Sequence, residues 1–273
     1  MSADDKKKFA PAAQIAETFV TARLNAKALK EFPGEMPPDL DCAYQCQDAA
    51  IKLWPDAVAG WKIGKIPDPL QAKFGCHRLG GPIFARNVYH FSGKEIACGV
   101  FVGGTACFEA EYIFEVAHDA DPTKLSYSIE DAAELAGKLY VGVEMAGSPL
   151  ADINGLGPHI VVSDFGNNAD EIVGKEIPGW RALKWEDLTV ESYIDETRVG
   201  TGSAANIPGG PLESLQFIAQ NCARRGLALK KGQLISTGAA TGVHDIVSGQ
   251  TARAVFAGIE TICVSTHPRV PVN

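Results

Sequence analysis

One apolar stretch near the middle of the chain, residues 106–116, constrains the fold more than any other part of the sequence. In a β-strand, successive side chains point to opposite faces, so Glu109 and Glu111 would share one face. The other face would be strongly apolar, because it carries Phe108, Ala110, Tyr112 and Phe114. We expect such a strand at the centre of a sheet. Two partly desolvated carboxylates about 7 Å apart repel each other, so one must be protonated or both must meet a cation.

A third carboxylate follows a second apolar run. Glu144 ends the segment 139–144, where a charge has no packing role. Three carboxylates without a neighbouring His or Cys suit Mg²⁺ or Mn²⁺, which keep positions open for water and substrate. The alternative is a strand whose solvent-facing side carries ordinary charge, the commoner origin of an E-x-E pattern. Because Glu144 stands where exposure is not expected, the sequence favours a metal site formed by Glu109, Glu111 and Glu144.

A lysine and a loop of small residues are candidates for contacts with substrate. Lys62 lies in the middle of the apolar segment 60–64, which glycines bracket. It is either a surface lysine or a buried ammonium that pairs with a substrate carboxylate or with the glutamates. Residues 233–242 run from a strand into a loop whose hydroxyl and N–H groups could receive an anionic group; the candidates are Thr237, Gly238 and Thr241. A tight structural turn is the alternative there.

Hydrophobic periodicity and turn residues predict an α+β fold with a mixed, largely antiparallel sheet or roll. Helices are expected at about 9–31 and 39–54, at 128–138 and at 211–225. Strands are expected at 59–63, 82–84, 99–102, 106–116, 139–145, 159–163, 192–199, 233–236, 252–256 and 259–265. The chain is accordingly divided into a helical N-terminal region, 1–58, and a β-rich catalytic domain, 59–273. Strands do not alternate with long helices, which argues against a doubly wound parallel sheet.

Charge and cysteine usage narrow the classes of partner. The 25 basic and 33 acidic residues give a net charge of −8, which disfavours nucleic acid and anionic membranes as partners. No apolar run approaches the roughly 20 residues that a membrane span needs. Seven cysteines without a C-x-x-C pair, and a polar start without a signal-peptide core, predict a cytoplasmic protein with free, mostly buried thiols.

Several motifs, taken in order, resemble the 2-oxopent-4-enoate hydratase and 4-oxalocrotonate decarboxylase group of the fumarylacetoacetate hydrolase superfamily. The resemblance extends from about Gly60 to the end of the chain. The matching elements are residues 60–64, 82–84, the Glu109-x-Glu111 pair, Val143-Glu144, Asp164, residues 208–212 and residues 232–242. Each element is weak alone, but their order makes the set fairly specific. A glutamate at position 144 is similar to the hydratase branch, whereas the carbon–carbon hydrolases tend to have aspartate there.

The resemblance implies a β-rich roll with a helical N-terminal part, assembled into homo-oligomers. It implies Mg²⁺ or Mn²⁺ on Glu109, Glu111 and Glu144. The substrate would be a small anionic 2-hydroxydienoate or its 2-oxo tautomer, with Lys62 close to its 2-oxo and carboxylate groups. The expected reaction is addition of water to give a 4-hydroxy-2-oxo acid, with Asp164 as a group that could orient the water.

The sequence also departs from the pattern of this group. Where hydratases commonly carry an acidic residue after the P-x-F-like segment, this chain has Arg86. An arginine would attract a second anionic group, which makes decarboxylation of a dicarboxylic 2-oxo acid the second hypothesis. Acylpyruvate-type carbon–carbon hydrolysis is the third, and it would need a base such as His90 or His118 near the metal. A non-catalytic partner subunit that retains the metal site is the fourth.

Overall fold

The computed structural model describes residues 8–272, which form an α+β fold. The α-helices are α1 (Ala12–Leu24), α2 (Leu40–Leu53), α3 (Asp68–Phe74), α4 (Ile129–Leu135), α5 (Ile153–Leu156), α6 (Pro158–Ser163) and α7 (Pro211–Arg224). Short 3₁₀ helices lie at Ala85–Asn87, Phe165–Asn167, Trp180–Ala182, Trp185–Asp187 and Ala204–Asn206. Among the helices of the described residues, none is long and apolar enough to cross a membrane.

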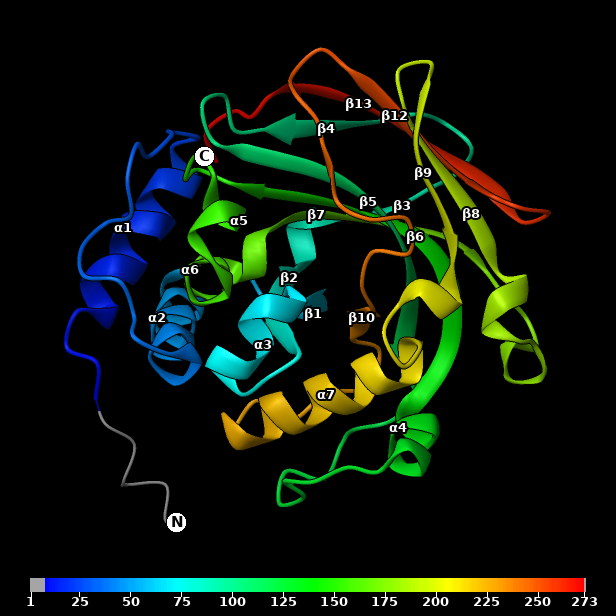
Figure 1. Ribbon diagram of the computed structural model, residues 1–273, viewed down its shortest axis with the longest axis horizontal. Helices are drawn as coiled ribbons and strands as arrows, with labels where there is room; N and C mark the ends of the chain where they lie inside the picture. Colours follow the sequence, from blue (N-terminus) through cyan, green and yellow to red (C-terminus); the bar gives the residue numbers. More distant parts are fainter. Residues whose placement is uncertain (1–7, 273) are drawn as a thin grey trace.

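The strands form two sheets. They are β1 (Val58–Lys65), β2 (Arg78–Phe84), β3 (Val88–His90), β4 (Ile96–Val100), β5 (Thr105–Val116), β6 (Ala136–Ser148), β7 (Asn168–Glu176), β8 (Thr189–Ile194), β9 (Thr197–Ser203), β10 (Leu234–Ser236), β11 (His244–Asp245), β12 (Thr251–Phe256) and β13 (Glu260–Pro268). The eight-stranded sheet has the order β2-β1-β10-β5-β6-β7-β3, with β11 also paired to β5. The five-stranded sheet has the order β4-β13-β12-β8-β9. Most neighbours are antiparallel, and the large sheet curls around the helices α3 and α7 (Figure 1).

The central position predicted for the segment 106–116 is confirmed. β5 pairs with β10 on one side and with β6 on the other. Its apolar face, formed by Phe108, Ala110, Tyr112 and Phe114, is fully buried in the main core, which also takes up side chains of the second sheet. The Tyr112 hydroxyl donates to the Leu188 carbonyl oxygen at 2.6 Å, so the one polar atom of this face is satisfied. Five of the seven cysteines are buried, in line with the expectation of mostly buried thiols.

The capping residues predicted at the starts of two helices are present in the structure. The Asp39 side chain accepts from the Cys42 N–H at the start of α2. Ser128 and Asp131 form the expected capping box of α4, although 136–138 begin β6 rather than extend the helix. The first helix is shorter than predicted and ends at Leu24.

The N-terminal helices pack against one edge of the large sheet, beside α5 and α6 (Figure 1). Arg23 fixes α1 there, because its guanidinium forms an ion pair with Asp164 (Nε to Oδ1, 2.5 Å) and donates to the carbonyl oxygens of Gly147 and Asn168. The division of the chain at residue 58 remains a proposal, and residues 1–7 lie outside the described part.

Two strand predictions are wrong. Residues 159–163 are rich in β-branched side chains, but they form α6, which starts with Pro158 at its first turn. The side chains of residues 160–163 are buried in this helix, so tertiary packing overrides strand propensity. Residues 192–199 are not one strand: a turn with Asp195 at φ 52° separates β8 from β9. The helix α3 and the strands β3, β7 and β11 were not predicted at all.

Candidate metal and substrate site

The three glutamates predicted to bind metal meet in the structure. Glu109 and Glu111 share a face of β5, and Glu144 lies directly opposite Glu109 on β6. One carboxylate oxygen from each of the three lies within 4.8 Å of the others. All three side chains are buried, with Glu111 and Glu144 fully excluded from solvent. The sheet register alone therefore brings together three carboxylates that a shift by one residue would separate.

Lys62 is buried and faces the glutamates. This agrees with the second of the two alternatives for this lysine, a buried ammonium group. On β1 it pairs with Ser236 of β10, and β10 in turn pairs with β5. Its Nζ lies 3.1 Å from Oε2 of Glu144. Burial by itself would lower the pKa of Lys62, but the carboxylates of Glu144, Glu109 and Glu111 raise it above its ordinary value. The side chain therefore remains an ammonium group inside the protein.

One ammonium group does not balance the carboxylates. Burial, opposed in part by Lys62, raises the pKa of Glu109 from 4.5 to about 7. Burial and the charges of Glu144 and Glu109 raise the pKa of Glu111 well above its ordinary value. A cluster of this kind is stabilised by protons at low pH or by a cation at neutral pH.

Neighbouring groups orient the carboxylates but do not satisfy all their oxygens. The Ser236 hydroxyl lies 2.6 Å from Glu111 Oε2, and the Gly238 N–H donates to the same oxygen at 2.8 Å. The Asn168 amide donates to Glu144 Oε1 at 3.0 Å. Glu111 Oε1 is buried and has no hydrogen-bond partner among the described residues. Three buried carboxylates with oxygens close to one another, one of them without a partner, fit the oxygen coordination of Mg²⁺ or Mn²⁺.

A fourth buried glutamate belongs to the cluster and was missed in the sequence. Glu171 on β7 lies directly opposite Glu144 and is fully buried. Its Oε1 lies 2.9 Å from the Ser236 hydroxyl, while its Oε2 has no hydrogen-bond partner among the described residues. Burial and the neighbouring charges of Glu144 and Glu111 raise the pKa of Glu171 well above its ordinary value. Glu171 is not among the three residues whose carboxylate oxygens lie within 4.8 Å of one another. It contacts the cluster through the Ser236 hydroxyl.

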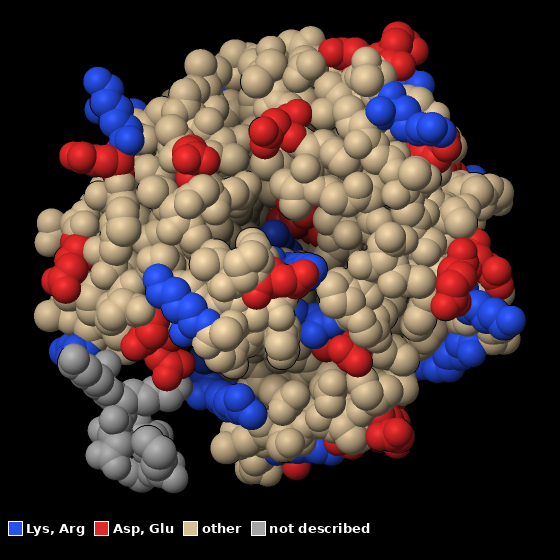
Figure 2. Space-filling view, in the orientation of Figure 1, with Lys and Arg blue, Asp and Glu red and all other residues tan. Residues whose placement is uncertain are grey.

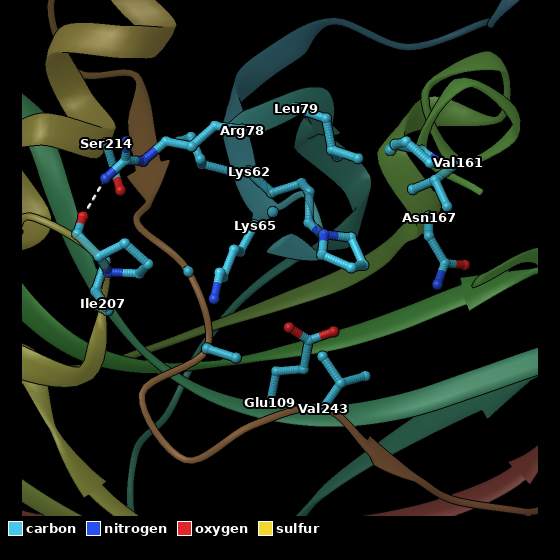
Figure 3. A pocket seen from close by; sticks show the side chains of 18 of the residues that line it. Lys62, Lys65, Arg78, Leu79, Glu109, Val161, Asn167, Ile207, Ser214 and Val243 are labelled. Atoms are coloured by element: carbon cyan, nitrogen blue, oxygen red, sulfur yellow. Dashed lines mark hydrogen bonds between the residues drawn. The ribbon is translucent and has the colours of Figure 1, made fainter. Parts of the chain in front are cut away.

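A pocket of about 520 Å³ opens onto this cluster. In the space-filling view, the face of the molecule is hollowed at its centre, and acidic and basic side chains are visible inside (Figure 2). Of the predicted site residues, Lys62, Glu109, Thr237 and Gly238 line the pocket, whereas Glu111 and Glu144 do not. Figure 3 shows the Glu109 carboxylate pointing into it. The apolar part of the wall includes Leu70, Leu79, Val161, Ile207 and Val243.

Three other candidate residues lie elsewhere. Thr241 does not line the pocket, and its hydroxyl lies 2.7 Å from that of Ser192. Asp164 is also outside the pocket lining and is engaged by Arg23 and by the Ser148 hydroxyl at 2.5 Å. Arg86 is exposed and lines a second cavity of about 230 Å³, beside Trp54 and Arg269. The structure therefore does not bring these three side chains to the pocket that Lys62 and Glu109 line.

Other polar residues, to which the sequence analysis gave no role in the site, line the pocket. Two are cationic, Lys65 and Arg78, and three are asparagines, Asn154, Asn167 and Asn206. Asn167 Oδ1 is buried without a hydrogen-bond partner among the described residues. Neither His90 nor His118 lines the pocket. No motif marks Lys65, Arg78 or Asn167 in the sequence, because the chain brings them together only by folding.

The fold of the chain also occurs in solved structures of several enzymes. No family model matches the sequence. The structure is similar to 4-oxalocrotonate decarboxylase from Pseudomonas putida G7 complexed with magnesium and adipate (TM-score 0.77, 18% identity, 95% of this chain and 100% of that chain). It is also similar to fumarylpyruvate hydrolase from Pseudomonas aeruginosa in complex with Mn²⁺ and pyruvate (TM-score 0.55, 15% identity, 77% of this chain and 89% of that chain).

A third similar structure is 5-carboxymethyl-2-hydroxymuconate delta-isomerase from Mycobacterium smegmatis (TM-score 0.55, 13% identity, 78% of this chain and 81% of that chain). These likenesses show that the chain shares the fold of this group of enzymes. They confirm the predicted α+β roll and, at the level of the fold, the resemblance found in the sequence. The three similar proteins catalyse different reactions, so the reaction of this chain must be argued from its own residues.

Proposed function

We propose that the chain is a divalent-metal-dependent lyase of the fumarylacetoacetate hydrolase superfamily that acts on a small 2-oxo acid. The observation that carries the proposal is the meeting of three buried carboxylates and Lys62 beside one pocket, which Lys62 and Glu109 line. Similar structures complexed with magnesium and with Mn²⁺ support the choice of cation. Glu109, Glu111 and Glu144 would hold it, and when bound it would act as a Lewis acid that stabilises negative charge on the 2-oxo group.

The leading reaction is addition of water to a 2-hydroxydienoate, through its 2-oxo-enoate tautomer, to give a 4-hydroxy-2-oxo acid. Conjugate addition places the water oxygen on C4 and a proton on C3. Lys62 would hold its proton at Nζ and donate a hydrogen bond to the substrate carboxylate or 2-oxo oxygen, because its raised pKa keeps it charged. Asn167 Oδ1, buried and without a partner, would accept a hydrogen bond from the attacking water. This is the role that the sequence analysis gave to Asp164.

Decarboxylation of a dicarboxylic 2-oxo acid is the second candidate. It is favoured by Arg78 and Lys65, two cationic side chains in the pocket wall. The similarity to a decarboxylase complexed with adipate, a dicarboxylate, supports it as well. Carbon–carbon hydrolysis has less support, because His90 and His118 are absent from the pocket lining. We further infer a cytoplasmic homo-oligomer: the free thiols support a reducing compartment, and the resemblance in the sequence supports assembly.

The decisive experiment is a calorimetric titration of Mn²⁺ into metal-stripped protein, with and without oxalate as a mimic of the enolised 2-oxo acid. We expect metal binding that oxalate strengthens, and we expect Glu109→Gln to abolish it. Glu115→Gln is the matched control, because Glu115 lies on the same strand and only accepts from the Tyr140 hydroxyl at 3.0 Å. Absence of binding in the wild type would overturn the proposal.

Turnover then separates the reactions. Formation of a 4-hydroxy-2-oxo acid from a 2-hydroxydienoate without release of carbon dioxide would identify hydration. Release of carbon dioxide from a dicarboxylic 2-oxo acid would identify decarboxylation. A protein that binds metal and oxalate, yet turns over neither substrate, would be the non-catalytic partner subunit.

A further inference from the structure

One side of the pocket carries polar groups that the glutamate site does not use. Arg78, the first residue of β2, projects toward the start of α7, where its Nη2 donates to the Pro208 carbonyl oxygen. The same Nη2 lies 3.4 Å from Glu213 Oε2. The Arg78 side chain is 12% exposed, and its Nε and Nη1 have no partner among the described residues. A guanidinium has five N–H donors in a planar fork, so Arg78, which lines the pocket, keeps donors that could bind an anion there.

Ser214 presents a second unused donor in the same wall. It lies in the first turns of the fourteen-residue helix α7, one position after Glu213. Its hydroxyl is fully buried and has no hydrogen-bond partner among the described residues. A serine in a helix usually satisfies its hydroxyl on a backbone carbonyl of the preceding turn. A buried hydroxyl left without a partner is destabilising, and a ligand that accepts its hydrogen would remove that cost.

Lys65 also lines the pocket, although its side chain is 48% exposed and paired with Asp68 at 2.8 Å. Among the described residues, Glu213 is the carboxylate that pairs with Arg78, and it is 45% exposed and 3.4 Å away. Figure 3 places Arg78 and Ser214 on the same side of the pocket and Glu109 on another.

We propose that Arg78 and Ser214 form a carboxylate subsite for the far end of the substrate. The inference rests on the proposed function, since the glutamates and Lys62 would hold the 2-oxo acid end. The substrate is then a dicarboxylic 2-oxo acid rather than a simple 2-oxo alkanoate or alkenoate. Arg78 takes the part that the sequence analysis assigned to Arg86, which lines the other cavity.

The test uses pairs of ligands that differ only at their far end. 2-Oxoadipate and 2-oxohexanoate have the same chain length, and 2-oxoglutarate and 2-oxopentanoate give a shorter pair. Binding of each to the Mn²⁺-loaded protein is measured by calorimetry, with oxalate as the probe of the glutamate end alone. In the wild type we expect at least one diacid to bind about tenfold or more tightly than its monoacid partner, as for a hydrogen bond to a charged group.

Variants assign the preference to its residues. Arg78→Ala should abolish it while oxalate binding persists, and Ser214→Ala should reduce it about threefold or more. Ser214→Ala removes an unsatisfied buried hydroxyl, so its thermal unfolding temperature should not fall, which keeps the test valid if Arg78→Ala folds poorly. Arg86→Ala is the matched control and should keep the full preference. Lys65→Gln should change it less than Arg78→Ala, because Lys65 is more exposed.

The possible outcomes test the subsite and the proposed function separately. Equal affinity for diacid and monoacid in a wild type that binds oxalate would overturn the subsite and leave the proposed function intact. A diacid preference that Arg78→Ala and Ser214→Ala both retain would overturn it as well. If oxalate fails to bind with metal but a diacid binds in an Arg78-dependent manner, the subsite stands and the proposed function falls. Absence of all binding overturns both.

Discussion

Glu144 and Glu171 lie directly opposite each other on β6 and β7, both fully excluded from solvent. Because Glu109 lies opposite Glu144 on its other side, three glutamates form one row across three neighbouring strands. Like charges in directly opposed positions destabilise a sheet. The row therefore persists only if protons, Lys62 or a cation offset the repulsion, and the predictions below follow from how that compensation is shared.

Replacement of Glu171 by glutamine should leave metal binding nearly unchanged. Ser236 has one hydroxyl hydrogen but approaches both Glu111 and Glu171, so one carboxyl group must donate to it. The raised pKa of Glu171 fits a neutral acid, which glutamine resembles in shape and charge. We expect the Mn²⁺ dissociation constant of Glu171→Gln to stay within about threefold and the unfolding free energy to rise by up to about 1 kcal/mol. The exposed Glu176 of the same strand supplies the control Glu176→Gln, and a tenfold loss of metal affinity only in Glu171→Gln would show a charged Glu171.

Substitution of Lys62 should separate catalysis from metal binding. Its ammonium group lies 3.1 Å from a metal-binding carboxylate and lines the pocket, so it both faces substrate and competes with the cation. Lys62→Met should lower kcat by about a hundredfold or more, in the range of lost proton-transfer or charge stabilisation. The Mn²⁺ affinity should be equal or higher, because a competing positive charge is gone. Lys230→Gln, at an exposed ion pair, controls for loss of a lysine. An unchanged kcat in Lys62→Met would contradict a role in the reaction.

Asp164 should prove to be a stability residue. It forms a buried ion pair with Arg23, and removal of one partner of such a pair leaves an uncompensated charge that costs about 3–5 kcal/mol. Asp164→Asn and Arg23→Gln should therefore both lower the free energy of unfolding measured in urea. Neither should change the binding of Mn²⁺ with oxalate in the folded protein, measured well below the unfolding temperature. If Asp164→Asn abolished turnover at full stability, the earlier assignment as a water-orienting group would be restored.

The metal-free protein should lose stability as the pH rises from about 5 to 8. The pKa of Glu109 is raised from 4.5 to about 7 in the folded chain, so between these values the folded state binds a proton that the unfolded state has released. Stability is therefore greatest at the acidic end of this window and falls as the pH increases through 7. Glu111 shifts in the same direction. Added Mn²⁺ should reverse the trend, because it binds the deprotonated carboxylates. Thermal unfolding with and without Mn²⁺ across this range measures both slopes, and parallel slopes would exclude the coupling.

The sequence predicted those parts of the site that interrupt a regular pattern. Glu109, Glu111 and Lys62 are conspicuous because each is a charge within an apolar strand, and the alternation of β5 fixes which face they share. Glu171 gave no such signal. The strand β7 has buried Asp170 and Glu171 ahead of Ile172, so its composition resembles that of an exposed turn. Only the pairing of β7 with β6 makes these charges internal.

The other differences between the predicted and the observed site also arise from long-range contacts. Arg86 looked suited to bind an anion because of its place in a family pattern, yet the chain turns outward after Phe84 and leaves it exposed. Arg78 and Ser214 are more than one hundred positions apart, on β2 and α7, and neither lies in a recognisable motif. Their common position in the pocket arises from the packing of a helix on a strand, which local periodicity does not encode.

The position of β10 in the large sheet also determines when, during synthesis, the sheet can be completed. Residues 234–236 lie between β1 and β5, so the strand that carries Lys62 and the strand that carries Glu111 are joined only by a segment that leaves the ribosome late. A nascent chain stopped before Leu234 already contains Lys62 and all four buried glutamates, but it lacks the strand that holds lysine and glutamates together. Until then β5, β6 and β7 can pair and place the glutamates side by side, but Lys62 has no strand that holds its ammonium group against them.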